Sequence, residues 1–225
     1  MFDLDYKFLI IFVPVILFSL TIHEYAHAYI ANKLGDDTAK RLGRLTLNPL
    51  KHLDPLGTIL LLLVHFGWAK PVPVDPRNCK NPKKDMLYVA IAGPISNILT
   101  AIVAAVILKF FVLNAGGAGN TASFTDPMIQ LLVWLIFIGV VLAVFNMLPF
   151  PPLDGSRVLY GLLPDSMGDS IKKIETYGIL IIFGLILLGG KYFSIILIYP
   201  FFIFIHLFGF NNYELNLIAN VIFNR

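Results

Sequence analysis

The sequence predicts an all-α polytopic membrane protein with five to six transmembrane or re-entrant helices and a small membrane-associated β-sheet or hairpin. Of its 225 residues, 57% are hydrophobic and only 14% are charged, whereas soluble domains carry about 25% charged residues. Several apolar runs approach or exceed the roughly 20 residues that a helix needs to cross a bilayer. We expect one membrane-embedded domain over residues 1–225. No cluster of basic and aromatic residues suggests a nucleic-acid partner.

The N-terminal apolar run predicts a first transmembrane helix over residues 6–34. We expect it to be retained, because Asp3 and Asp5 stand where a signal peptide carries basic residues and because the run is too long. Further helices are expected over residues 86–113, 127–148, 174–188 and 193–210. The glycine-rich, nearly uncharged linker at 114–126 is typical of a short external loop.

A shorter apolar run, residues 56–68, separates two polar stretches at 35–54 and 70–85. A helix of about 13 residues reaches about 20 Å, which is less than the bilayer core of about 30 Å. We therefore expect a re-entrant or shallow segment. Both polar stretches and their borders are rich in cations, so both should be cytoplasmic. The cations are Lys33, Lys40, Arg41, Arg44, Lys51, Lys70, Arg77, Lys80, Lys83 and Lys84.

The two polar stretches also predict the small sheet. Arg44, Thr46 and Asn48 alternate with leucines, as in a short strand. The Pro-Val-Pro run at 71–73 is typical of an extended segment. An exposed edge of such a sheet could pair with an extended substrate backbone.

Residues 23–27 read His-Glu-Tyr-Ala-His, near the end of the first helix. Histidines at i and i+4 share one helix face, so both imidazoles can reach one metal ion. Glu24 lies beside that face, where it can accept a proton from a metal-bound water. The alternative is a helix that carries these residues by chance. It is disfavoured because an ionisable group in lipid costs about 2.5 kcal/mol or more.

A catalytic zinc ion normally takes three protein ligands and leaves one position for water. Candidates for the third ligand, by side-chain chemistry, are His52, Asp54, His65, Asp154, His206 and Glu214. Asp154 is favoured because it follows the third full crossing, whose end should be level with His23 and His27. Prolines at 149, 151 and 152 would stop the helix there. The alternative for Asp154 is a solvated residue in a proline-rich turn.

Three motifs together resemble the site-2 protease family of intramembrane metalloproteases. They are His-Glu-Tyr-Ala-His at 23–27, Gly-Pro-Ile-Ser-Asn at 93–97, and the stretch from Asn146 to Gly155 that ends in Pro-Pro-Leu-Asp-Gly. The similarity covers nearly the whole chain and is to the compact members, which lack a PDZ or CBS domain. It implies one zinc ion held by His23, His27 and Asp154, with Glu24 as the general base.

The resemblance also implies hydrolysis, within the bilayer, of transmembrane or membrane-proximal segments of substrate proteins. Asn146 and Asn97 match family asparagines that hold an unwound substrate or polarise its scissile carbonyl. The alternative for each is an amide that hydrogen-bonds between helices. The expected location is the cell membrane, as a multi-pass protein with its active site toward the cytoplasm.

Two competing functions are a catalytically silent metal-binding membrane protein and a metal transporter. A transporter should carry ionisable residues along successive helices, as a path. The late apolar runs carry few of them, His206 being one. A silent relative should lack Glu24 or a ligand, and none is missing.

Overall fold

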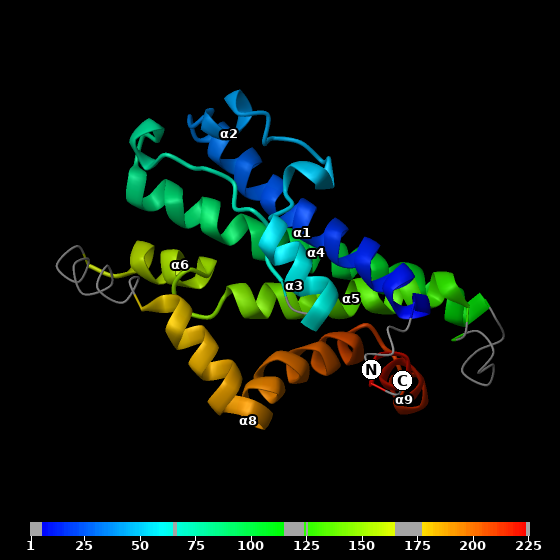
Figure 1. Cartoon of the computed structure of the whole chain (residues 1–225). Helices are drawn as coiled ribbons and strands as arrows, with labels where there is room; N and C mark the ends of the chain where they lie inside the picture. Colours follow the sequence, from blue (N-terminus) through cyan, green and yellow to red (C-terminus); the bar gives the residue numbers. More distant parts are fainter. Residues whose placement is uncertain (1–5, 65–66, 115–123, 125, 165–176, 224–225) are drawn as a thin grey trace. The chain divides into compact units, whose positions relative to one another are not determined.

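The computed structural model describes residues 6–64, 67–114, 124, 126–164 and 177–223, which are mostly helical (Figure 1). The elements are α1 (Tyr6–Lys33), α2 (Thr38–Arg41), the 3-10 helix η1 (Pro49–Lys51), α3 (Pro55–Val64), the 3-10 helix η2 (Pro76–Asn78), α4 (Pro82–Asn114), α5 (Pro127–Asn146), α6 (Asp154–Leu162), α8 (Gly178–Leu207) and α9 (Asn212–Phe223). The expected external loop at 114–126 lies largely outside the described residues.

Three of these helices are long and apolar enough to cross a membrane. The spans are Phe8–Lys33 in α1, Pro82–Leu113 in α4 and Pro127–Asn146 in α5. One face of α4 leaves large apolar side chains exposed at helical spacing: Ile95, Leu99, Val103, Val106 and Phe110. Soluble proteins rarely expose so much contiguous apolar surface, whereas lipid suits it. The prediction of an α-helical membrane protein is confirmed. The count of five to six membrane helices stays a prediction.

Contacts divide the described residues into two compact units. The first draws on Met1–Ser19, Asn97–Val144 and Lys191–Arg225, and the second on Leu20–Ser96 and Phe145–Gly190. The interior of the first unit is largely apolar; the ring of Phe137, for example, meets that of Phe201 edge-on at 5.0 Å between centroids. The second unit holds most of the buried ionisable side chains, among them His23, His27, Asp36, His52 and Asp154. A single domain over the whole chain stays a prediction.

Helix α3 lies in a segment that turns back on itself. Its ten residues reach about 15 Å, half of the bilayer core. Before and after it, the backbone meets: Lys70 N–H donates to the carbonyl of His52 at 2.8 Å, and Leu53 pairs with Ala69 in an isolated antiparallel bridge. The chain therefore enters and leaves this segment at the same level, as expected of a re-entrant segment.

The expected β-sheet does not form within the described residues, where that bridge is the only β-pairing. Pro49, Pro71 and Pro73 cannot donate to a ladder. Side chains also take up carbonyls that a ladder would use. The ring Nε2 of His52 lies 2.8 Å from the carbonyl of Thr46, and the Arg44 guanidinium donates to the carbonyl of Lys70 at 2.7 Å. The prediction of a strand from the alternation of leucines with polar residues is therefore wrong.

Helix boundaries also differ from the sequence expectation. Helix α4 starts at Pro82 instead of residue 86, because proline suits the first turn and the Asp85 carboxylate accepts the Asn81 N–H at 2.9 Å. The expected helices at 174–188 and 193–210 correspond to the two helical parts of α8. A kink at Gly190, with φ 41° and ψ −117°, separates these parts. Glycine adopts positive φ without a steric cost. Residues 174–176 lie outside the described part.

Candidate metal centre

Helix α1 presents two histidines to one point. His23 and His27 are 4% and 7% exposed, and their Nε2 atoms lie 3.0 Å apart. The other ring nitrogen of His27, Nδ1, lies 2.7 Å from the carbonyl of Val89 on α4. Because a carbonyl can only accept, Nδ1 carries the proton in neutral His27. Its Nε2 is then left with a lone pair, as a metal ligand requires.

Asp154 completes the cluster from the first residue of α6. Its Oδ2 lies 3.1 Å from the Nε2 of His23 and 3.2 Å from that of His27. Burial raises the pKa of this carboxyl, but the two histidines lower it by more, so the net pKa lies below the usual range.

The turn before α6 places Asp154 by close backbone packing. A Cβ atom at Gly155 would lie 2.3 Å from the carbonyl oxygen of Met147 and 2.4 Å from that of Leu148. Only glycine allows the start of α6 to lie so close to the chain that leaves α5. The glycine in Leu-Asp-Gly thus has a steric reason for its place beside the aspartate.

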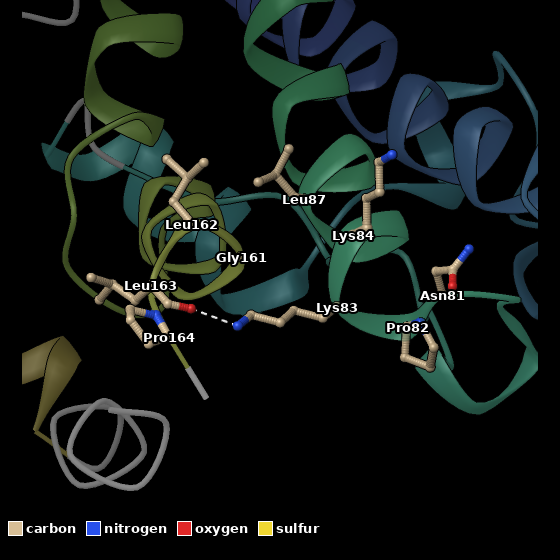
Figure 2. Close-up of a pocket in the computed structure, with 9 residues that line it drawn as sticks. All are labelled: Asn81, Pro82, Lys83, Lys84, Leu87, Gly161, Leu162, Leu163 and Pro164. Carbon is tan, nitrogen blue, oxygen red and sulfur yellow. Dashed lines mark hydrogen bonds between the residues drawn. The ribbon is translucent and has the colours of Figure 1, made fainter. Parts of the chain in front are cut away.

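The far end of α6 is fixed to α4. Lys83 Nζ donates to the carbonyl of Leu163, which follows the last turn of α6, at 2.5 Å (Figure 2). A pocket of about 680 Å³ lies at this junction, and its lining includes Lys84, Leu87 and Leu162. None of its lining residues belongs to the histidine–aspartate cluster, so this pocket is separate from the candidate metal centre.

Gly93 on α4 leaves the space in front of the three ligand atoms open. A Cβ atom there would lie 2.4 Å from the Nε2 of His27 and 2.6 Å from that of His23. A tetrahedral zinc ion with ligand distances of about 2.0–2.2 Å separates its ligands by about 3.3–3.6 Å, slightly more than the observed 3.0–3.2 Å. Three lone-pair atoms this close require a cation or a proton among them. The residues fit a metal ion.

Glu24 stands beside the cluster and makes a different contact. Its side chain is half-buried, and its Oε2 accepts the backbone N–H of Val72 at 2.7 Å. It is not one of the clustered ligand atoms, which come from His23, His27 and Asp154. This placement leaves Glu24 available for proton transfer.

The two asparagines do not contribute to the clustered ligand atoms, which come from His23, His27 and Asp154. Asn146 is the half-buried last residue of α5 and belongs to the same unit as the cluster. Asn97 is fully buried in α4, within the first unit, where its backbone approaches Gly139 of α5. Their substrate roles stay predictions.

The other candidate ligands have other surroundings. The His52 ring contacts the Thr46 carbonyl, the Asp54 carboxylate accepts the Gly57 N–H at 2.8 Å, and Glu214 pairs with Lys109 at 2.9 Å. His206 is exposed near the end of α8, and His65 lies outside the described residues. None of the four described ones joins His23 and His27.

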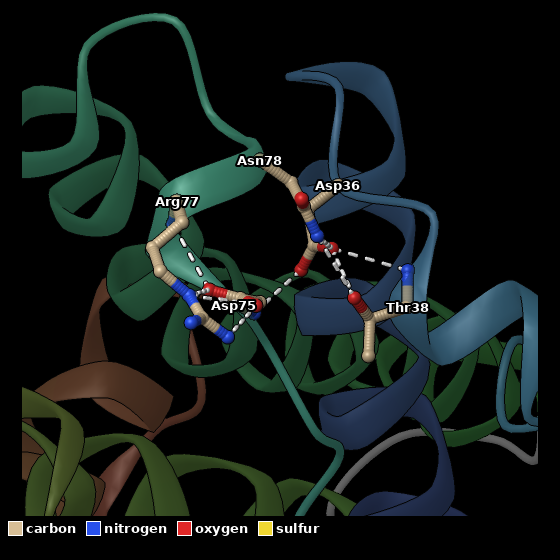
Figure 3. Close-up of polar contacts among 5 residues, drawn as sticks. All are labelled: Asp36, Thr38, Asp75, Arg77 and Asn78. Atoms are coloured by element: carbon tan, nitrogen blue, oxygen red, sulfur yellow. Dashed lines mark hydrogen bonds and ion pairs between the residues drawn. The ribbon is translucent and has the colours of Figure 1, made fainter.

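A second polar cluster, which the sequence did not single out, surrounds Asp36. This fully buried carboxylate accepts the N–H and hydroxyl of Thr38, the side-chain amide of Asn78 and the Asp75 N–H, as Figure 3 shows. Burial raises the pKa of Asp36, but these donors lower it below its usual value. The adjacent Arg77 lowers the pKa of Asp75 to about 2. The cluster fastens residues 36–38 to residues 75–78.

Comparison with known proteins identifies the family. The peptidase family M50 model matches residues 112–190. A Bacillus subtilis protein named "Putative zinc metalloprotease YwhC" is 45% identical over 169 residues, which cover 75% of this chain and 76% of that protein. "Putative zinc metalloprotease Rip2" of Mycolicibacterium smegmatis is 30% identical, over 74% of this chain and 62% of the relative. "Zinc metalloprotease MJ0392" of Methanocaldococcus jannaschii is 28% identical, over 80% and 42%.

A membrane protein with a buried histidine–histidine–aspartate cluster fits the class of membrane metalloproteins. The chain belongs to peptidase family M50, the site-2 protease family. The family predicted from the three motifs is confirmed. The alignments span less than two thirds of the lengths of the Rip2 and MJ0392 proteins. No solved structure matches the chain.

Proposed function

We propose that this protein is an intramembrane zinc metalloprotease in which His23, His27 and Asp154 hold one zinc ion and Glu24 is the general base. The observation that carries the proposal is the convergence of three buried ligand atoms at 3.0–3.2 Å from one another. The relatives are named as zinc metalloproteases, which favours hydrolysis over metal transport or silent binding.

The chain's own residues supply orientation and proton transfer. Zinc, when bound, supplies a Lewis acid that activates water and polarises a peptide carbonyl. Glu24 accepts the proton of the attacking water and passes it to the nitrogen of the departing amine. The Val89 carbonyl keeps the proton of His27 on Nδ1, so that Nε2 would have a lone pair with which to hold the ion.

The substrates are transmembrane or membrane-proximal segments of other proteins. A helical substrate must unwind first, because its carbonyls are held in i to i−4 hydrogen bonds. We assign the holding of this freed backbone to Asn146, the half-buried last residue of α5. For Asn97, complete burial favours a hydrogen bond between helices over contact with substrate.

The proposed location is the cell membrane, with the active site toward the cytoplasm. The cations of residues 33–51 and 70–84 support this orientation under the positive-inside rule. The re-entrant form of the α3 segment agrees, because both cation-rich stretches then lie on one side.

Replacing Glu24 with Gln tests the proposed mechanism. The amide cannot accept the proton of water, so cleavage of a membrane substrate in detergent should fall by about 10²- to 10⁴-fold. Zinc content should stay at one ion per chain, because no ligand changes. Asp37→Asn removes a carboxylate of the same unit outside the cluster and should cleave at the wild-type rate. Undiminished turnover by the Glu24→Gln protein would contradict the proposed role.

A further inference from the structure

Residues 70–75, Lys-Pro-Val-Pro-Val-Asp, pass beside the metal centre without forming a helix or strand. Pro71 and Pro73 have no N–H group, so Val72 carries the only backbone donor between them. That donor points at the Glu24 carboxylate and meets Oε2 at 2.7 Å. It is the only hydrogen bond that Glu24's side chain makes among the described residues.

The segment is held at both ends by groups outside the metal centre. At one end, Lys70 donates its N–H to His52 and accepts from Arg44 through its carbonyl, at 2.8 and 2.7 Å. At the other end, Asp75 N–H donates to Asp36 at 2.7 Å, within the polar cluster of Figure 3. The segment therefore keeps its course without help from Glu24.

The Val72 side chain fixes the middle of the segment. It is 8% exposed and packs in a small apolar cluster with Ala28 and Ala39, which Leu45 partly covers. Ala28 directly follows His27 on α1. The side chain of Val72 is thus seated on the helix that carries Glu24, while its N–H faces the carboxylate.

We propose that the backbone N–H of Val72 positions Glu24 for proton transfer, which makes Val72 a positioning residue for hydrolysis. This inference rests on the proposed function. A glutamate side chain has three rotatable bonds and would otherwise sample several rotamers. One hydrogen bond to Oε2 orients the carboxylate and leaves Oε1 to accept the proton of water. Misplacement of a reacting group by about 1 Å can cost about 100-fold in rate.

An amide-to-ester replacement at position 72 tests the inference. Incorporating the α-hydroxy analogue of valine in the full-length protein removes the N–H and keeps the side chain. We expect kcat to fall about 10- to 100-fold, with KM within about twofold of wild type. Zinc content should stay at one ion per chain.

The matched control is the same replacement at Val74. It also follows a proline, and its N–H makes no hydrogen bond among the described residues. Equal kcat in the two ester proteins, with Glu24→Gln inactive, would overturn the inference and leave the proposed function standing. Loss of zinc from the position-72 ester would also overturn it, because the segment would then hold the metal centre itself. Activity in Glu24→Gln would instead overturn the proposed function, and the inference with it.

Discussion

At the scale of single residues, the metal centre depends on Gly93, which has no side chain, as much as on the side chains that would bind the ion. His23 and His27 follow from their i, i+4 spacing, but the space in front of them exists because position 93 of α4 has no Cβ atom. Any larger residue would occupy the space in which a metal ion fits. The glycine of Gly-Pro-Ile-Ser-Asn therefore keeps open the space in which an ion can bind.

Gly93→Ala should weaken metal binding while leaving the chain inserted. Its Cβ would lie 2.4–2.6 Å from atoms of both histidines, so zinc affinity should fall at least tenfold. Zinc content by mass spectrometry checks this. Gly184→Ala in α8, where a Cβ meets nothing within 4 Å, should bind zinc normally. Full zinc occupancy in the Gly93→Ala protein would show that the ion does not lie among these three ligand atoms.

The sequence predicted which residues form the candidate metal centre better than it predicted the contacts that hold those residues in place. His23, Glu24, His27 and Asp154 stand out because ionisable groups are rare in apolar surroundings. The contact of Val72 with Glu24 could not be predicted, because a backbone N–H is present in every residue except proline. The carbonyl of Val89 escapes sequence analysis for the same reason. The roles of the four residues stay predictions.

At the scale of elements, the long apolar helices and the short apolar helix α3 were predictable, whereas the short helices α6 and α9 were not. Helices α1, α4 and α5 follow from hydropathy within a few residues. Helix α6 is short and carries Asp154, and α9 buries one face that includes Glu214 and Ile218. Both depend on contacts with segments distant in sequence, such as Lys83 with Leu163 and Lys109 with Glu214. Within the described part of the chain the expected sheet does not form, because the alternation of leucines with polar residues is interrupted by prolines that cannot donate to a ladder.

The re-entrant form of the α3 segment can be tested by cysteine labelling. In a Cys79→Ser background, single cysteines at Lys51 and Lys70, both exposed, should react with an impermeant thiol reagent from the same side of the membrane. The hydrogen bond between His52 and Lys70 requires this. A cysteine at exposed Asp126, beyond the crossing by α4, should react from the other side. Labelling of positions 51 and 70 from opposite sides would show that α3 spans the bilayer.

At the scale of the whole molecule, the chain separates two kinds of interior. The first unit is stabilised mainly by apolar and aromatic packing, as between Phe137 and Phe201. The second concentrates the buried ionisable groups, which are costly in lipid unless they are paired or bind an ion. Hydropathy predicted a membrane protein and the motifs predicted its family. How polar groups are distributed between two units could not be predicted, because it depends on tertiary contacts.

The most direct test of this account is zinc K-edge X-ray absorption on the wild-type protein, with Asp154→Asn for comparison. We expect one zinc ion bound by two imidazole nitrogens and one carboxylate oxygen at about 2.0–2.2 Å. Asp154→Asn should lose the carboxylate and bind zinc at least tenfold more weakly. Asp54→Asn, which alters another candidate ligand, should leave the spectrum unchanged. A protein without zinc, or a spectrum that Asp154→Asn does not alter, would contradict the proposed centre.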